Sequence, residues 1–365
     1  MTTSHPFMAS WAAASGRIPY LLDLTLWYRW HAGRGTLPPA WAGFSMARIA
    51  QELGVAAWVV ERPWRMEHRG ITVATEKAEG QRVVRYATRV GALTARWSLG
   101  PDGDWWQTEY PVKTVEDLPA ALAVIAAQHY RLAAPEAPSG AAKAPTAAGA
   151  PQPAVITALE LPMRPYADLI HTMLGWSEGL MLLKGEGRPI ILEMLALLEE
   201  QLAQLTETVA ALPGAVLLAP DNLNGQYISP RVYREHVAES YGRTAQVAHS
   251  HDKHLVVHAG GPMRKLLPLL AESGVDVIEG IASPPQGDAS LAEARAAAGP
   301  GLILWGGIAQ DYLLLAREQS EFEAAVQEAA RQVASDDLTI LGVADRVPVD
   351  ADLARLQAIP RLIAG

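Results

Sequence analysis

The chain has 365 residues, half of them apolar, and carries 39 acidic against 30 basic residues, which gives a formal net charge of −9. This acidic balance, without any basic run, argues against nucleic acid or an anionic membrane surface as a partner. Cysteine is absent, which excludes disulfides, thiolate nucleophiles and thiolate metal ligands.

The first twenty residues contain no sustained apolar segment. No apolar run in the chain approaches the ~20 residues that are needed to cross a bilayer. We therefore expect a cytoplasmic protein.

Eight short apolar runs follow one another along the chain, most of them separated by segments with a helical pattern. They lie around Tyr20 to Leu24, Ala56 to Val60, Val155 to Glu160, Val216 to Ala219, Leu255 to His258, Asp276 to Glu279, Leu302 to Trp305, and Leu338 to Leu341. Buried strands that alternate with helices predict an α/β fold of the (β/α)8 TIM-barrel type. We expect one barrel domain over residues 1–365, with its reactive end at the carboxyl ends of the strands.

Other segments indicate what surrounds these strands. Amphipathic patterns predict helices over Pro189 to Ala211 and Pro230 to His249. Residues 62–110 alternate in the manner of β-hairpins, which predicts an antiparallel flap inserted after the second strand. A helix is expected from Val115 to about Leu132, and the Ala, Pro and Gly-rich residues 133–154 predict a loop or linker.

Three strand ends present groups that can do chemistry, namely Asp221, His258 and Glu279. We expect these three side chains to converge at one opening and to act in catalysis. If a divalent metal such as zinc binds, they would supply one nitrogen and two oxygen ligands. The alternative is a histidine that hydrogen-bonds substrate or backbone without a metal.

Further side chains are candidates for binding a substrate, each with a plainer alternative. Arginines beside aromatic rings can hold a carboxylate or phosphate, or else form surface ion pairs and core packing. Amides after the fourth run can orient a substrate, or else satisfy a local turn. A carboxylate after the last run is either an acid or base, or a salt-bridged loop residue. These residues are Arg29, Trp30, His31 and Arg34, then Asn222 and Asn224, and finally Asp345. Asp288 is expected to cap the following helix.

Several fragments, taken in order, resemble one known family. APDNLNGQYISPRVYREHV, LVVHAGGPMRKLLPLLAESGVDVIEG, SPPQGDASLAEARAAAG and LILWGGIAQDYLL are similar to the uroporphyrinogen decarboxylase superfamily. That superfamily includes methyltransferases that serve corrinoid proteins. The resemblance implies a barrel enzyme with its site at the strand ends.

The chain departs from the family's motifs at several points. RWHAGR stands where the decarboxylases have Arg-Gln-Ala-Gly-Arg, Asp345 lies where they carry a histidine, and the thiol-methylating relatives' cysteine ligands are missing. The resemblance therefore favours methyl transfer from a small O- or N-methylated compound to a corrinoid on a partner protein. The alternatives are a cofactor-free decarboxylase of a porphyrinogen-like or other carboxylated ring, and a catalytically inactive binding protein.

Overall fold

The computed structural model describes residues 18–101, 103–133 and 155–364, so the predicted linker at 133–154 lies outside the described residues except for Ala133. The described chain divides into two compact units. One contains residues 18–62, 155–161 and 212–364. The other contains residues 63–133 and 162–211, and so holds more than the predicted insertion at 62–110. The prediction of a single barrel domain stays a prediction.

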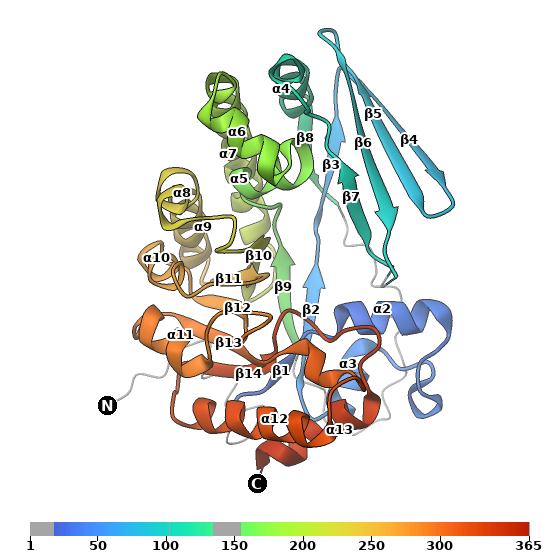
Figure 1. Ribbon diagram of the computed structural model, residues 1–365, viewed down its shortest axis with the longest axis vertical. Coiled ribbons are helices and arrows are strands. Elements are labelled where there is room, and N and C mark those ends of the chain that lie inside the picture. Colours follow the sequence, from blue (N-terminus) through green and yellow to red (C-terminus); the bar gives the residue numbers. More distant parts are fainter. Residues whose placement is uncertain (1–17, 102, 134–154, 365) are drawn as a thin grey trace. The chain divides into compact units, whose positions relative to one another are not determined.

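The first unit contains a parallel sheet of eight strands in the order of the chain (Figure 1). Its ends meet, because Tyr20 forms a parallel bridge with Leu341 and the Leu341 amide donates to the Pro19 carbonyl at 2.8 Å. The barrel and its eight predicted runs are confirmed. The strands are β1 (Leu21–Leu22), β2 (Ala56–Glu61), β9 (Val155–Glu160), β10 (Val216–Leu223), β11 (His254–Ala259), β12 (Val277–Ile281), β13 (Ile303–Ile308) and β14 (Thr339–Val343).

The inside of the barrel is filled by apolar side chains from every strand. Because successive side chains of a strand point to opposite faces, these residues identify the inward-facing positions of each strand. Trp58 and Trp305 meet edge to face there, with ring centroids 5.0 Å apart. The cluster consists of Leu21, Ala56, Trp58, Ala158, Val216, Leu218, Val256, Val277, Ile303, Trp305 and Ile340.

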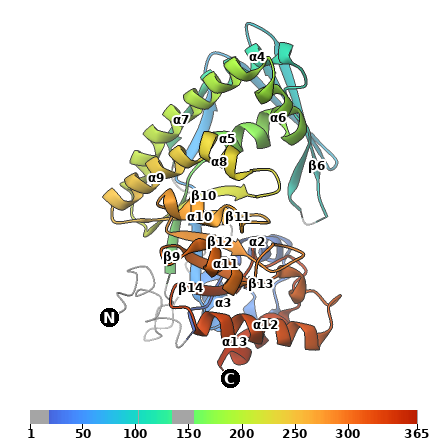
Figure 2. The same cartoon turned by 60° about the vertical axis from the view of Figure 1, so that its left-hand side comes forward.

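Helices of the first unit run beside the strands, as Figure 2 shows for α8 to α13. The predicted helix Pro230 to His249 is two helices, because Val237 leaves the helical conformation at φ −124°. Asp288 does not cap α11; Ser290 does, in a reciprocal pair with Glu293. The helices are α2 (Thr25–Arg34), α3 (Met46–Glu52), α8 (Pro230–His236), α9 (Ala238–Ser250), α10 (Leu267–Glu272), α11 (Leu291–Ala298), α12 (Gln319–Ala334) and α13 (Leu353–Ala364), with short 3-10 turns at Pro39–Trp41 and Gln310–Leu313.

The second unit confirms the predicted hairpins and adds helices. Strands β4 (Thr72–Ala78), β5 (Gln81–Ala87), β6 (Ala92–Leu99) and β7 (Trp105–Glu109) form an antiparallel sheet, and β3 (Trp64–His68) pairs with β8 (Gln128–Leu132). Its helical segments are η2 (Val115–Asp117), α4 (Leu118–Ala126), α5 (Pro165–Asp168), the π-helical η3 (Leu169–Leu174), α6 (Trp176–Lys184) and α7 (Arg188–Ala210).

One predicted helix of this unit is too long. The segment from Val115 is helical only to Ala126, and Gln128–Leu132 is a strand. Pairing with β3 provides backbone partners, and the rings of Trp64 and Tyr130 pack edge to face 5.3 Å apart. This tertiary pairing outweighs the local helical pattern. Among the helices described in the two units, none has the length and apolarity to cross a membrane.

Candidate active site at the carboxyl ends of the barrel strands

His258 and Glu279 lie side by side at the carboxyl ends of two paired strands. His258 is two residues after the inward-facing Val256 on β11, and Glu279 is two residues after the inward-facing Val277 on β12. The two residues are partners in the strand register. Alternation therefore turns both side chains to the inside of the barrel, where they meet.

The His258 ring is held between two carboxylates. Its Nδ1 hydrogen-bonds Oε2 of Glu279, and its Nε2 lies 3.5 Å from Oδ1 of Asp345. Asp345 follows β14 in a left-handed conformation, at φ +67°, and its Oδ1 also lies 3.7 Å from Nε of Arg346. We call His258, Glu279 and Asp345 the mouth cluster.

The two carboxylates favour the charged form of the His258 ring. Burial alone would lower the pKa of His258, but the Glu279 and Asp345 carboxylates outweigh it and raise that pKa to about 9, against an opposing effect of Arg346. Burial raises the pKa of Glu279 to about 7, although the neighbouring imidazole favours its ionised form; Asp345 and Asp23 add to the rise. His258 is therefore a cation at neutral pH, with Glu279 poised to gain or lose a proton.

Two side chains of the mouth cluster are partly exposed to solvent. The side chains of His258 and Asp345 are 23% and 28% exposed, whereas that of Glu279 is 8% exposed. Among residues 18–101, 103–133 and 155–364, Oε1 of Glu279 is buried and has no hydrogen-bond partner. A carboxylate oxygen in this situation is an acceptor that lacks its donor, which is the arrangement expected where a substrate supplies the donor.

Asp221 does not join these residues. It follows the outward-facing Ala219 by two positions on β10, and its Oδ2 accepts a hydrogen bond of 2.5 Å from the Tyr241 hydroxyl of α9. Its side chain is buried, with 1% of the residue exposed. The expected convergence with His258 and Glu279 is therefore wrong, because Asp221 lies on the other face of its strand.

The predicted metal site fails for the same reason. Across the described ranges, no three His, Cys, Asp or Glu side chains are arranged to hold a metal ion. The ligand set of His258, Glu279 and Asp221 is not formed. We derive no chemistry from a zinc or other metal at this position.

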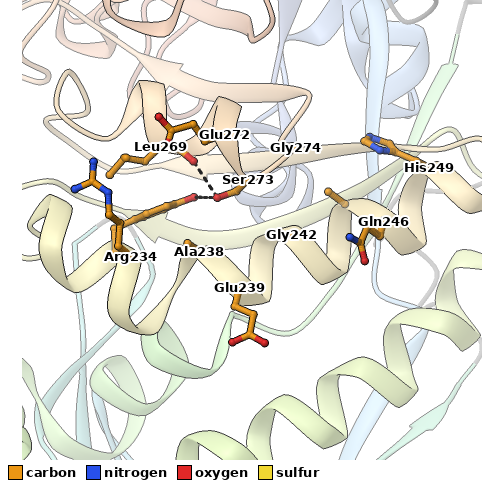
Figure 3. Close-up of a pocket in the computed structure, with 12 residues that line it drawn as sticks. Arg234, Ala238, Glu239, Gly242, Gln246, His249, Leu269, Glu272, Ser273 and Gly274 are labelled. Carbon is orange, nitrogen blue, oxygen red and sulfur yellow. Dashed lines mark hydrogen bonds between the residues drawn. The ribbon is translucent and has the colours of Figure 1, made fainter.

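Asp221 instead supports the wall of a groove on the outer helix layer. The ring of Tyr241 stacks on that of Tyr233 at 6.0 Å, and the Tyr233 hydroxyl donates to Oγ of Ser273 at 3.0 Å. The Ser273 hydroxyl donates in turn to the Leu269 carbonyl, a contact that Figure 3 shows at the edge of a cavity of about 510 Å³ between α9 and α10. None of the mouth cluster lines this cavity.

Three of the four candidates on α2, namely Trp30, His31 and Arg34, have contacts within the protein. Nδ1 of His31 lies 2.8 Å from Oγ1 of Thr36, and its Nε2 lies 2.8 Å from the Val349 carbonyl. The guanidinium of the exposed Arg34 lies over the ring of Trp30, 3.3 Å from its centroid. Arg29 is also exposed. These contacts agree with the packing alternative, and a role in substrate binding stays a prediction for all four residues.

Asn222, near the end of β10, and Asn224, just after it, pack against the chain that follows His258. Nδ2 of Asn224 donates to the Gly260 carbonyl at 3.3 Å, and its Oδ1 accepts from the Gln226 amide at 2.8 Å. A Cβ on Gly260 would lie 1.5 Å from Oδ1 of Asn222, so only glycine fits there. Asn224 thus performs the turn role that was the alternative, while contact of either with a substrate stays a prediction.

Asp288 stabilises the same region. Its Oδ1 accepts hydrogen bonds from the amides of Met263 and Arg264, at 2.8 and 3.0 Å. The carboxylate therefore satisfies the loop that follows β11. Asp288 lies 25 positions after Met263 and 24 after Arg264 in the sequence, so a pattern within a short segment could not predict these hydrogen bonds.

Two charged residues at strand ends, Glu160 and Asp23, were not predicted as site residues from the sequence. Glu160 follows the inward-facing Ala158 by two positions, and its Oε1 accepts from Nε of Arg62 at 2.6 Å. Asp23 follows the inward-facing Leu21 by two positions and acts electrostatically on Glu279. The sequence could have predicted both residues. Side chains alternate between the two faces of a strand, so a residue two positions after an inward-facing one also faces inward.

Comparison with known proteins finds one family model that matches part of the chain. Residues 191–364 match the family model described as Uroporphyrinogen decarboxylase (URO-D). The mouth cluster lies within the matched residues. No curated protein sequence matches the chain.

One of the solved structures is similar to nearly the whole chain and not only to residues 191–364. A methyltransferase from Methanosarcina mazei is 12% identical, with 98% of this chain and 97% of that chain covered at a TM-score of 0.57. At this identity the match shows a shared fold. Xylanase B from Clostridium stercorarium F9 is 13% identical over 52% of this chain and 68% of that chain, but its TM-score of 0.31 carries no argument.

Proposed function

We propose that the protein is an enzyme that transfers a methyl group from a small O- or N-methylated compound to the reduced cobalt of a corrinoid on a separate protein. The observation that carries the proposal is the His258 ring held between Glu279 and Asp345 at the carboxyl ends of the barrel strands. The match to the uroporphyrinogen decarboxylase family model and the fold shared with a methyltransferase support the reaction class.

The chemistry needs a heteroatom that departs as a neutral group. The carbon–heteroatom bond breaks with its electron pair left on oxygen or nitrogen, while the acceptor supplies the pair for the new bond to carbon. An ether oxygen leaves well only if it gains a proton, and an amine only if it carries one already. The cationic His258 can give an oxygen that proton, and the carboxylates beside it can keep an amine protonated.

The proposal is tested by anaerobic incubation of the protein with a panel of methylated ethers and amines and a reduced corrinoid protein. We expect at least one compound to methylate the corrinoid, seen as a change in its absorption spectrum. His258→Gln is expected to slow transfer at least about tenfold, because it removes both the proton source and the cation that orients two carboxylates. Glu239→Gln, on the exposed side of α9, is the matched control and should transfer at the normal rate.

The family match favours one second candidate, a decarboxylase of a carboxylated ring. Arg29 and Arg34, the predicted carboxylate holders, are both exposed, and Arg34 lies over Trp30, which does not support it. Release of carbon dioxide from uroporphyrinogen, with no corrinoid methylation across the panel, would reverse the order of the two proposals. Absence of both reactions would favour the binding protein.

A further inference from the structure

The mouth of the barrel carries an excess of negative charge. Asp23, Glu279 and Asp345 act on one another or on His258, and the nearby cations are His258 and Arg346. Three carboxylates against two cations leave one negative charge on these groups when all are ionised. Asp23 uses Oδ1 to accept from the Thr25 amide at 2.8 Å, which fixes its position after β1. A monocation bound here would neutralise the site, whereas a neutral ether would not.

An independent observation indicates the kind of group that binds. Oε1 of Glu279 is buried and has no hydrogen-bond partner in the described part of the chain, and only 6% of the residue is exposed. The other oxygen, Oε2, is already occupied by His258. An ionised carboxylate accepts hydrogen bonds and cannot donate them, so Oε1 requires an N–H or O–H group from the ligand. The oxygen of an ether has no such hydrogen.

We propose that the substrate is an N-methylated amine bound in its protonated form, with its N–H donating to Oε1 of Glu279 while Asp345 and Asp23 supply negative charge. This inference rests on the proposed methyl transfer and narrows its substrate class. The carbon–nitrogen bond breaks, its electron pair stays on nitrogen, and the amine leaves neutral with its proton retained. His258 keeps its proton in this step and is a positioning residue that orients both carboxylates.

Binding distinguishes this proposal without any corrinoid protein. Calorimetry at pH 8 measures the affinities of an amine, an ether and a quaternary ion of similar shape. The first set is N,N-dimethylethylamine, its neutral isostere 2-methoxypropane, and N,N,N-trimethylethylammonium. Sets of larger compounds follow. We expect a protonated amine to bind at least about tenfold more tightly than its ether, because a charge-assisted hydrogen bond is formed only by the amine. The quaternary ion, which has no N–H, should bind less tightly than the amine.

Substitution of Glu279 tests whether its side chain is the one that binds the amine. Glu279→Gln keeps the size of the side chain and should weaken amine binding at least about 30-fold, while leaving binding of ethers unchanged. The exposed Glu239→Gln has the same change of charge on the outer layer and should bind amines like the wild type. Circular dichroism and the melting temperature of each variant show whether the fold is kept. If Glu279→Gln does not fold, Asp345→Asn replaces it in this test. We expect Asp345→Asn to lose slightly less affinity for amines than is expected of Glu279→Gln.

The outcomes separate this inference from the proposed function. Equal binding of amine and ether, no binding of any amine, or amine binding that Glu279→Gln leaves intact overturns the inference. Corrinoid methylation by ethers alone overturns it while the methyl transfer stands. Amine binding that depends on Glu279, without methyl transfer, supports the amine site and contradicts the methyltransferase.

Discussion

Two groups of polar side chains in the barrel unit have similar chemistry and different surroundings. In the mouth cluster, Glu279 hydrogen-bonds a histidine, and its other oxygen has no partner among the residues that the structure describes. On the outer layer, Asp221 bonds the Tyr241 hydroxyl, and the stacked rings lead through Tyr233 to Ser273. We call this second group the outer cluster. The first leaves an acceptor for a ligand, and the second connects a strand to its helices.

The difference follows from which face of a strand each carboxylate occupies. Glu279 is an even number of positions from the inward-facing Val277, whereas Asp221 is an odd number from the inward-facing Leu218. A carboxylate at the end of a barrel strand is therefore a candidate for chemistry only if alternation turns it inward. The predictions below test this contrast.

The largest effect is expected from Glu279→Gln. Methyl transfer should fall about 10²- to 10³-fold in kcat/KM, because a buried charge contact to the substrate is lost. The free energy of unfolding should fall by about 1 to 3 kcal/mol, because the variant removes the charged partner of His258 although Gln can still accept a hydrogen bond. Kinetics and urea unfolding of the same preparation measure both. A large loss of stability with normal transfer would place Glu279 with the outer cluster.

We expect Asp221→Ala to lower the stability of the protein and to leave methyl transfer nearly unchanged. Removing this acceptor takes away the hydrogen bond that the buried Tyr241 hydroxyl donates, and the free energy of unfolding should fall by about 3 kcal/mol. Transfer by the remaining folded protein should stay within about threefold of the wild type. Tyr241→Phe is the matched change on the other partner and should cost less, about 1 to 2 kcal/mol. Loss of transfer without loss of stability would contradict this assignment.

The sequence was sufficient to predict the barrel, its eight strands, and the meeting of His258 with Glu279, because apolar runs and alternation are local patterns. Asp221 was misplaced because its carboxylate was assigned by proximity to a strand end rather than by its face. The contact of Asp345 with His258 depends on a left-handed residue after β14 and on barrel closure, and the β3–β8 pairing replaced part of a predicted helix. Both are long-range effects that a local pattern does not contain.

The affinity for a protonated amine should depend on pH through Glu279. Burial, with Asp345 and Asp23, raises its pKa to about 7, although His258 favours the anion. The anion is the form that binds a cation, so the affinity should rise about tenfold between pH 6 and pH 8, where aliphatic amines stay protonated. Calorimetry across this range provides the measurement, and Glu279→Gln should show a flat profile. An affinity that falls as pH rises would contradict the assigned proton state.

The smallest effect is expected from Tyr233→Phe in the outer cluster. It removes the hydrogen bond to Ser273, which has a second contact with the Leu269 carbonyl. The free energy of unfolding should fall by about 1 kcal/mol, and the affinity for amines should be unchanged. Urea unfolding and calorimetry of the variant measure the two. An altered affinity would link the outer groove to the barrel mouth.

The most direct test concerns the proton state of His258. Nitrogen-15 NMR of the imidazole, with His258→Gln to assign the signal, follows its titration. We predict that both ring nitrogens carry protons at pH 7.5, that the pKa is about 9, and that the pKa falls in Glu279→Gln. A neutral His258 ring at pH 7.5 would contradict the claim that two carboxylates hold a cation at the open end of the barrel.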